Sequence, residues 1–168
     1  QVRAMKDMVD DFRDYARLPQ PVLARVDLSD VVRDVLALYE GSRNAVDSKL
    51  DPTPQLVLGD RTQLRQVIHN LLRNAQDALP EGGRVTVATH RDVRGAQLVI
   101  SDDGPGFPAE IIARVFDPYV TTKSRGTGLG LAIVKKIVDE HHGSIEVANL
   151  EPRGAQVVIT LPVAEGEH

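Results

Sequence analysis

Two asparagines, Asn70 and Asn74, stand four residues apart in a segment whose apolar residues recur at helical spacing. Residues at this spacing project from the same side of a helix. An amide oxygen is a neutral ligand, suited to Mg²⁺ that already carries phosphate oxygens and water. The pair therefore predicts a metal or phosphate contact. For this spacing alone, two amides on a helix surface remain the alternative.

A turn rich in aspartate and glycine, Asp102–Phe107, follows directly on a strand-like apolar run. The carboxylate of Asp102 could accept a hydrogen bond from the exocyclic amine of adenine, a donor that guanine does not offer at that place. Gly104 and Gly106 allow the backbone to turn sharply and to come close to a ring. The turn indicates an adenine contact, and a plain Asp-Gly-Pro-Gly turn is the alternative.

Three glycines at alternate positions, Gly126, Gly128 and Gly130, precede an apolar segment of helical spacing. Backbone amides at the start of a helix can cradle phosphate, helped by the positive end of the helix dipole. The run is not a P-loop, because no Gly-Lys-Ser/Thr follows, and it is not a Rossmann fingerprint, because no strand leads straight into it. A tightly packed, glycine-rich helix entry is the alternative.

The segment Phe116–Thr127 has no apolar period and predicts a mobile loop. Lys123 and Arg125 are cations on this loop beside glycines, and they could reach phosphates when the loop closes. Phe116 and Tyr119 could anchor the loop against the core. Exposed basic residues on a polar loop are the alternative.

The first segment of the chain predicts an amphipathic helix with a heptad-like apolar seam. Leu18-Pro19-Gln20-Pro21 ends this helix, because Pro lacks the amide proton and disfavours helix in the residue before it. We expect the helix either to pair with another chain or to pack on its own domain. The seam consists of Val2, Met5, Val9, Phe12 and Ala16.

The rest of the chain mixes helical and strand patterns. Ser29 predicts the N-cap of a helix that runs to about Glu40, and Asp60 followed by Gln63 resembles a capping box. His141 and His142 lie at a helix C-terminus, which favours cations. The expected helices are Arg61–Leu79, Pro108–Val115 and Gly128–His141, and the expected strands are Ala45–Leu50, Gln55–Leu58, Arg84–His90, Gln97–Ser101, Ser144–Ala148 and Ala155–Leu161. This order predicts an α+β fold with a sheet covered on one face by helices.

The composition fits one soluble globular domain. At 168 residues, with 42% hydrophobic residues, the chain is long enough for a real core. It has no Cys, which excludes disulfides and thiolate metal sites. A net charge of -4 without a dense basic run argues against nucleic acid as a partner. Short apolar runs argue against a membrane span and against direct membrane contact. The chain opens without Met, which suggests a piece of a longer protein.

Together and in this order, the four stretches resemble the GHKL ATPase superfamily with its Bergerat nucleotide-binding fold. Over about residues 21–163 the chain is similar to the catalytic and ATP-binding domain of bacterial sensor histidine kinases. The family's N-box, first glycine box, F-box and second glycine box are matched by Gln66–Ala75, Asp102–Gly106, Phe116–Tyr119 and Gly126–Leu131. Phe12–Pro19 further resembles the end of the dimerisation helix in kinases of the NtrY nitrogen-regulation type. The resemblance implies a two-layer α/β sandwich with a mixed sheet, preceded by a helical segment.

The resemblance also implies a role for each matching position. Asn74 would ligate Mg²⁺, and Asn70 would support the metal and the phosphates. Asn70 and Lys123 would be the catalytic residues, and Asp102 would read adenine. The implied ATP contacts are Asn70, Asn74, Asp77, Asp102, Gly104, Gly106, Phe107, Lys123, Arg125, Gly126, Thr127, Gly128, Leu129, Gly130 and Leu131. Many relatives carry a basic residue at the place of Asp77, so Lys123 or Arg125 must carry more of that charge here.

Two differences narrow the expected chemistry. Hydrolytic members of the superfamily hold Glu at the place of Asn70 as a general base for water, and Asn cannot take a proton. ATP should therefore be kept for a protein acceptor. The family's acceptor His is followed by an acidic residue and soon by a Pro, and no histidine of this chain has that context. These histidines are His69, expected at the rim of the site, and His90, His141, His142 and His168.

The resemblance therefore implies a catalytic and ATP-binding domain over residues 21–168, preceded over residues 1–20 by the end of a dimerisation helix. It would pass the γ-phosphate of ATP to a His on its own dimerisation domain, outside this chain, and a response regulator would take it next. The implied whole protein is a homodimer at the cytoplasmic end of a membrane-bound sensor, and this chain alone would not phosphorylate itself. A serine kinase of the anti-sigma-factor type and a non-catalytic nucleotide- or partner-binding module are the alternatives.

Overall fold

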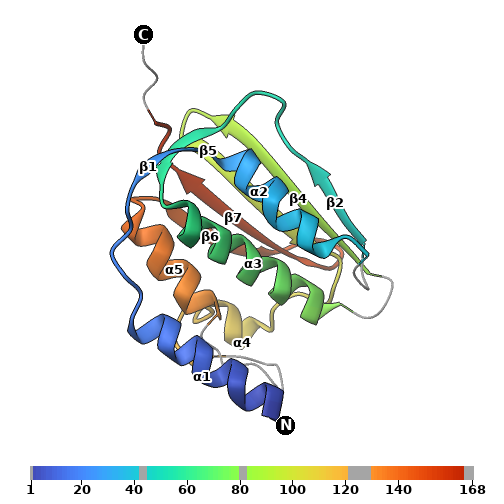
Figure 1. Ribbon diagram of the computed structural model, residues 1–168. Coiled ribbons are helices and arrows are strands. Elements are labelled where there is room, and N and C mark those ends of the chain that lie inside the picture. The colour runs from blue at the N-terminus through green and yellow to red at the C-terminus, as the bar shows by residue number, and fades with distance from the viewer. Residues whose placement is uncertain (1, 42–44, 80–82, 121–129, 165–168) are drawn as a thin grey trace.

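The structure, a computed structural model, describes residues 2–41, 45–79, 83–120 and 130–164 (Figure 1). Helices and a mixed sheet form two layers, which confirms the predicted α+β fold. Across the described ranges, no helix is long and apolar enough to cross a bilayer. The helices are α1 (Val2–Ala16), α2 (Leu28–Leu36), the 3₁₀ turn η1 (Ala37–Tyr39), α3 (Arg61–Ala78), α4 (Ala109–Ile112) and α5 (Gly130–Glu140). The strands are β1 (Ala24–Asp27), β2 (Ala45–Lys49), β3 (Leu56–Gly59), β4 (Arg84–Asp92), β5 (Gly95–Asp102), β6 (Ser144–Asn149) and β7 (Ala155–Leu161).

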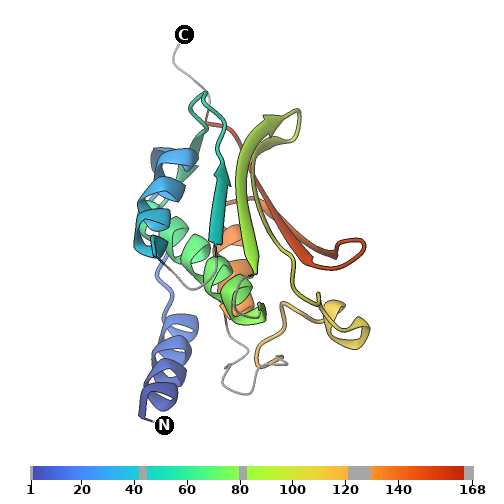
Figure 2. The ribbon, with the colours of Figure 1, turned by 90° about the vertical axis from the view of Figure 1, so that its right-hand side faces the viewer.

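The main sheet has five strands in the order β2-β4-β5-β7-β6, and β2 and β4 are its parallel pair. Figure 2 shows α2, α3 and α5 on one face of this sheet. Alternate residues of the strands, such as Leu98, Ile100 and Ile159, are buried in the core, since successive side chains of a strand point to opposite faces. A separate ribbon pairs β1 with β3 in antiparallel register.

Helix α1 extends beyond the two layers and is held at its C-terminal end (Figure 1). Tyr15 packs half-buried against the core, and the Nζ of Lys136 on α5 lies 6.0 Å from the centre of its ring. The Nε2 of Gln66 on α3 donates to Asp14 Oδ2 at 3.2 Å. The last turn of α1 is therefore tied to both α3 and α5.

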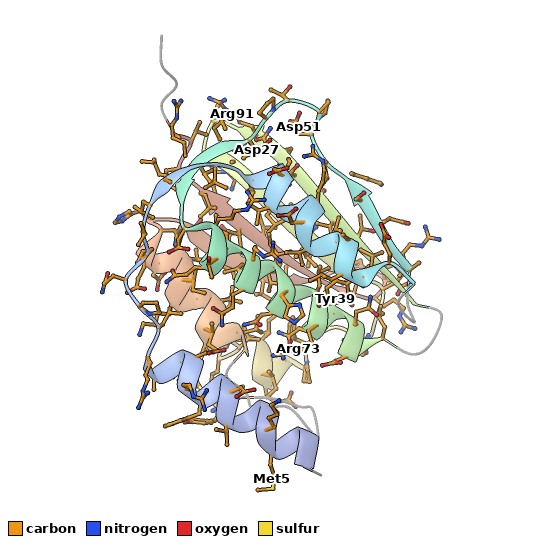
Figure 3. The ribbon with its side chains drawn as sticks, in the orientation of Figure 1. Met5, Asp27, Tyr39, Asp51, Arg73 and Arg91 are labelled. Carbon is orange, nitrogen blue, oxygen red and sulfur yellow. The ribbon has the colours of Figure 1, made fainter. Side chains whose placement is uncertain are left out.

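Three residues of the apolar seam of α1 face solvent. Met5, Val9 and Phe12 are 69%, 55% and 53% exposed, and Met5 points away from the sheet and its helices (Figure 3). The predicted helix is confirmed. Its seam is not covered by the domain at these three residues.

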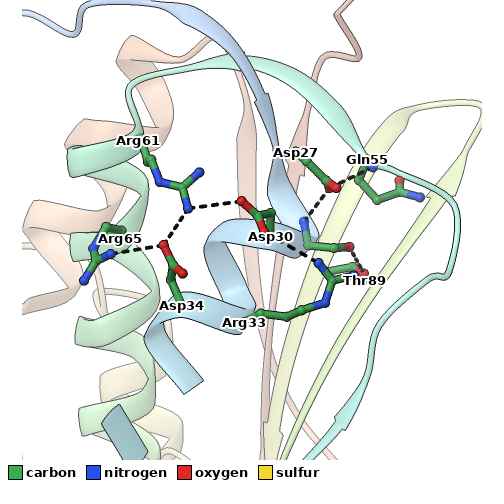
Figure 4. Close-up of polar contacts among 9 residues, drawn as sticks. Asp27, Asp30, Arg33, Asp34, Gln55, Arg61, Arg65 and Thr89 are labelled. Atoms are coloured by element: carbon green, nitrogen blue, oxygen red, sulfur yellow. Dashed lines mark hydrogen bonds and ion pairs between the residues drawn. The ribbon is translucent and has the colours of Figure 1, made fainter. Parts of the chain in front are cut away.

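Helix α2 is capped by Asp27, two residues before the predicted cap. Asp27 Oδ1 accepts hydrogen bonds from the N–H groups of Ser29 and Gln55, both at 3.0 Å (Figure 4). Ser29 is fully buried, and its hydroxyl lies 2.8 Å from the hydroxyl of Thr89 on β4. The prediction of Ser29 as N-cap is wrong, because its hydroxyl is hydrogen-bonded to Thr89 and the carboxylate of Asp27 caps the helix instead.

Helix α3 begins at the predicted cap. Asp60 Oδ1 accepts from the N–H of Gln63 at 3.2 Å, and Oδ2 accepts from the N–H of Val22 at 2.9 Å. The return bond of a capping box is absent, because the Gln63 side chain donates to the Pro19 carbonyl at 2.8 Å and the Asp60 N–H donates to His141 Nε2 at 3.0 Å. The linker after α1 and the end of α5 therefore both meet the start of α3.

His141 is 2% exposed and follows the last residue of α5. The Asp60 N–H can only donate, so Nε2 is the acceptor and the ring proton sits on Nδ1, which donates to the Ile137 carbonyl at 2.8 Å. A neutral imidazole satisfies both contacts. The expectation of a cation at this position is wrong, because the ring is a buried bridge between two helices.

Ion pairs join the exposed sides of α2 and α3 (Figure 4). Arg61 contacts Asp30 and Asp34, and Arg65 contacts Asp34 at 3.2 Å. The hydrogen bond from Arg61 holds the pKa of Asp34 below its ordinary value. These side chains are 42–54% exposed, so water and salt screen the pairs and they stabilise the helix contact only modestly.

Predicted element boundaries differ from the observed ones by a few residues in most cases. Helix α4 is shorter than predicted, and η1 completes the helix expected after Ser29. Strands β4 and β5 are longer, because Asp92 pairs with Gly95 across a two-residue turn. Residues 121–129, which hold much of the predicted loop and glycine run, lie outside the described residues.

Replacing His141 by Phe is expected to lower the free energy of unfolding by about 1–3 kcal/mol, because the Asp60 N–H loses its buried acceptor. The Ile137 carbonyl loses the ring donor but keeps the backbone N–H of residue 141. Urea unfolding followed by circular dichroism measures the change. The control is His90→Ala, at an exposed position of β4, where about 0.5 kcal/mol or less is expected. Equal effects of the two substitutions would contradict the role of His141 as a bridge.

Candidate functional site

One edge of α3 carries both predicted asparagines and faces the start of α5. Asn70 is 6% exposed, and its Nδ2 donates to the Gly130 carbonyl at 3.5 Å. A Cβ built on Gly130 would lie 3.8 Å from both polar atoms of the Asn74 side chain. The fold thus brings Asn70, Asn74 and Gly130 together, although Asn70 and Gly130 are 60 residues apart in sequence. We call Asn70 and Asn74 the amide edge.

The amide edge offers neutral oxygen ligands. Within the described parts of the chain, Asn70 Oδ1 accepts no hydrogen bond, while Asn74 takes part in a polar contact. A divalent cation that brings water and anionic oxygens of its own would fit this donor set.

The turn after β5 packs its backbone onto the end of α3. The N–H of Gly104 donates to Asp102 Oδ1 at 2.9 Å. A Cβ on Gly104 would lie only 3.0 Å from the carbonyl oxygen of Ala78, the last residue of α3. A side chain at position 104 would crowd this close approach, which places Asp102 relative to the amide edge.

The electrostatic setting of Asp102 suits a hydrogen-bond donor on a ligand. Burial raises the pKa of Asp102 above the ordinary value for aspartate. Hydrogen bonds from the N–H groups of Gly104 and Ala155 oppose the rise, and the charge of Asp103 adds to it. The ionised form is incompletely solvated, so a further donor would stabilise it.

A polar rim lies along α3 beside the amide edge. The hydroxyl of Tyr39 is 2.9 Å from His69 Nδ1, and Figure 3 shows Tyr39 beside α3, the helix that carries Arg73. Burial lowers the pKa of His69, and the charge of Arg73 lowers it further. Burial raises the pKa of Tyr39, Arg73 opposes this, and Asp77 adds to it. Asp77 is exposed and its charge acts on this rim, while its ATP contact stays a prediction.

The F-box-like segment is described only at its beginning. Phe116 is half-buried, but Tyr119 is 62% exposed with φ 69°. The prediction that Tyr119 anchors the loop is wrong, and Val115, at 5% exposure, is the buried residue here. Leu131 packs against the core from the first turn of α5. The predicted site residues outside the described ones are Lys123, Arg125, Gly126, Thr127, Gly128 and Leu129.

Sequence reasoning missed two side chains that hold the turn after Asp102. The Asn149 amide bonds both backbone groups of Phe107, at 2.8 and 2.9 Å, and Arg153 Nε donates to the Gly104 carbonyl at 3.3 Å. Both belong to the β6–β7 hairpin. Their pairing depends on strand register, and no local spacing in the sequence signals it.

A cavity of about 770 Å³ lies between η1 and β2. Its lining mixes apolar and charged side chains, among them Leu36, Val46 and Arg33, and includes none of the predicted site residues. The convergence of the amide edge, Gly130 and the Asp102 turn therefore marks the candidate site better than cavity volume does.

The fold and the site together define a nucleotide-binding class. The family model described as histidine kinase-, DNA gyrase B-, and HSP90-like ATPase matches residues 59–165. The chain therefore belongs to this family of ATPase-fold domains.

Within this family, the individual proteins that resemble the chain are named as sensor kinases and their relatives. The chain is 39% identical over 176 residues to the nitrogen regulation protein NtrY of Azorhizobium caulinodans, with 99% of this chain and 23% of that protein covered. It thus spans about a quarter of that relative. The structure of full-length ShkA in complex with AMPPNP is 28% identical, with a TM-score of 0.83 over 96% of this chain and 36% of that one.

A second solved structure, the histidine kinase ThkA in complex with the response regulator protein TrrA, is 26% identical with a TM-score of 0.82. The match covers 97% of this chain and 48% of that one. The predicted family and fold are confirmed by these likenesses. The residue roles at the site stay predictions.

ATP affinity is expected to fall as the pH is lowered through the raised pKa of Asp102, because a protonated carboxyl oxygen is a poorer acceptor for the adenine amine. The fall should begin at a higher pH than an ordinary aspartate would give. The stability of the ligand-free fold has the opposite sign. A raised folded-state pKa means that the folded chain binds the proton more tightly than the unfolded chain, so protonation of Asp102 stabilises the fold.

Calorimetric titration with ATP from neutral to mildly acidic pH measures the first effect. Asp102→Asn should bind ATP more weakly and with a flatter pH dependence, because its amide does not titrate in this range. Identical pH profiles for the two proteins would remove Asp102 from base recognition.

Proposed function

We propose that this chain binds ATP with Mg²⁺ and is the catalytic part of a sensor histidine kinase of the NtrY type. The observation that carries the proposal is the meeting of three segments: the amide edge, the start of α5 at Gly130 and the Asp102 turn packed on the end of α3. Membership of the ATPase family supports it. The structural likeness to full-length ShkA in complex with AMPPNP supports it too.

The base end of the site would be formed by the turn after β5. Asp102 accepts a hydrogen bond from the exocyclic amine of adenine, and the glycines allow the backbone to lie close to the ring. Gly104, Gly106 and Phe107 line this end. The half-buried carboxylate of Asp102 with its raised pKa supports the assignment.

The phosphate end would lie between α3 and α5. Asn74 ligates Mg²⁺, and Asn70 supports the metal and the phosphates through its amide oxygen. The bound Mg²⁺ neutralises phosphate charge. Lys123, Arg125 and the backbone amides of Gly126–Leu131 hold the phosphates, helped by the positive end of the α5 dipole.

The chemistry would be transfer to a protein rather than hydrolysis. An amide at position 70 cannot take a proton from water, so this chain lacks a general base at the place where hydrolytic relatives hold Glu. Catalysis then rests on positioning and on charge neutralisation. Among the rim residues, His69 is hydrogen-bonded to the Tyr39 hydroxyl, and its lowered pKa favours the neutral ring.

In the whole protein, α1 would be the end of a dimerisation helix, with the catalytic domain over residues 21–168. The exposed Met5, Val9 and Phe12 are a side that a partner helix of a homodimer could cover. The partners would be the chain's own dimerisation domain and a response regulator, as the ThkA complex with TrrA supports. Such a domain would work at the cytoplasmic side of the membrane.

A serine kinase of the anti-sigma-factor type is the second candidate, since it shares the resemblance. Helix α1 with its exposed apolar seam argues against it, because such a kinase would not normally follow a dimerisation-type helix. A non-catalytic binding module is the third, and it predicts that nucleotide does not bind.

Transfer of label from ATP tests the proposal. Incubated with γ-labelled ATP and Mg²⁺, the chain alone should gain no acid-labile label, because it lacks the acceptor histidine. A histidine-bearing dimerisation fragment added in trans should be labelled. Asn74→Ala should slow this transfer by about tenfold or more, through loss of the metal contact, while the control His90→Ala should not.

Acid-labile label on this chain itself, or rapid release of inorganic phosphate from ATP, would contradict the proposal. Acid-stable label on a serine-bearing partner would favour the second candidate.

A further inference from the structure

We propose that Asn149 is a positioning residue for the adenine end of the site, acting through the backbone of Phe107. The inference rests on the proposed ATP site. It adds the β6–β7 hairpin to the machinery that sets base specificity.

The contact between Asn149 and Phe107 is a matched pair of hydrogen bonds. The N–H of Phe107 donates to Asn149 Oδ1 at 2.8 Å, and Asn149 Nδ2 donates to the carbonyl of Phe107 at 2.9 Å. A side-chain amide thereby takes the place that a neighbouring strand would have, satisfying both backbone groups of one residue. The pair fixes the orientation of this peptide as well as its distance from the sheet.

The neighbouring glycines show how closely hairpin and turn approach. A Cβ on Gly106, which has φ 83°, would lie 2.8 Å from Asn149 Oδ1 and 3.0 Å from the Gly154 carbonyl. A Cβ on Gly154, which has φ 114°, would lie 2.2 Å from the Asp102 carbonyl. Both positions require glycine, because an added carbon would collide with backbone or with the Asn149 amide.

The same hairpin also contacts the residues on either side of the turn. The N–H of Ala155 bonds the carboxyl of Asp102, and Arg153 Nε donates to the carbonyl of Gly104. The turn is therefore held between α3, which meets Gly104, and the hairpin, which meets Asp102, Gly104 and Phe107. Asn149 supplies the contacts farthest along the turn.

The position of Asn149 shows that it does not serve to stabilise the core. It is the last residue of β6, an edge strand, and it is exposed, so its removal leaves the core intact. What its two bonds fix is the turn that carries the proposed base contacts. A displaced turn would weaken reading of the adenine amine by Asp102 more than it would weaken contacts to the phosphates.

Titration of the purified chain with ATP and with inosine triphosphate, both with Mg²⁺, tests the assignment. Inosine has a carbonyl where adenine has the amine, so it cannot make the hydrogen bond to Asp102. Asn149→Ala should weaken ATP binding by about tenfold, as expected for two hydrogen bonds. It should weaken inosine triphosphate binding by about threefold or less, so the preference for ATP shrinks. The melting temperature should stay close to that of the unsubstituted chain.

Glu146→Ala is the matched control, because Glu146 is an exposed residue of the same strand with no described hydrogen bond to the turn. It should change neither affinity. Arg153→Ala provides a second variant should Asn149→Ala fail to fold, and it should shrink the preference for ATP by about threefold through loss of one bond.

Suppose that the unsubstituted chain binds ATP. An Asn149→Ala variant that loses affinity equally for the two nucleotides, or for neither, would then overturn the role of Asn149 and leave the proposed function standing. Failure of the unsubstituted chain to bind ATP would overturn the proposed function, and the role of Asn149 with it.

Discussion

Burial of the apolar side of α3 is the interaction on which the rest of the site depends. Its core residues, among them Ile68 and Leu72, are almost fully buried between the sheet and the other helices, and Asp60 caps its start while meeting His141 from the end of α5. A helix held in this way cannot rotate, so the side next to its apolar stripe has a fixed direction. That side carries the amide edge, and the end of the same helix receives the Asp102 turn.

The same constraint gives the site its chemical character. The fold places neutral amides of α3 opposite Gly130 at the N-terminal end of α5, where the helix dipole is positive. The asparagines at positions 70 and 74 cannot act as bases. Such an arrangement is suited to binding a charged nucleotide with its metal and holding it for another acceptor. The polar rim and the last turn of α1 both contact α3. The proposed acceptor domain, which would continue from α1, would therefore also lie next to α3.

Local patterns in the sequence predicted what local physics decides. Helical spacing identified α3 and its asparagines, β-branched runs identified all the described strands except β1, and Asp60 was recognised as a cap. Strand β1 was missed, because its four residues are ordered by pairing with β3 rather than by a local pattern. The misses came from long-range pairing. Ser29 looked like a cap, but its hydroxyl meets Thr89 on a strand 60 residues away, and His141 looked like a helix-end cation, but it accepts from Asp60. Asn149 carried no signal, because its contact with Phe107 exists only once β6 and β7 have paired. Lys123 and Arg125 lie outside the described residues, so their roles remain predictions.

The most direct test of the central claim is a calorimetric titration of this chain with ATP, with Mg²⁺ present and after its removal by a chelator. The account predicts saturable binding at one site per chain, and a clear loss of affinity without Mg²⁺, because the amide edge meets the phosphates through the metal. Binding that is absent under both conditions, or that is equally strong without Mg²⁺, would contradict it.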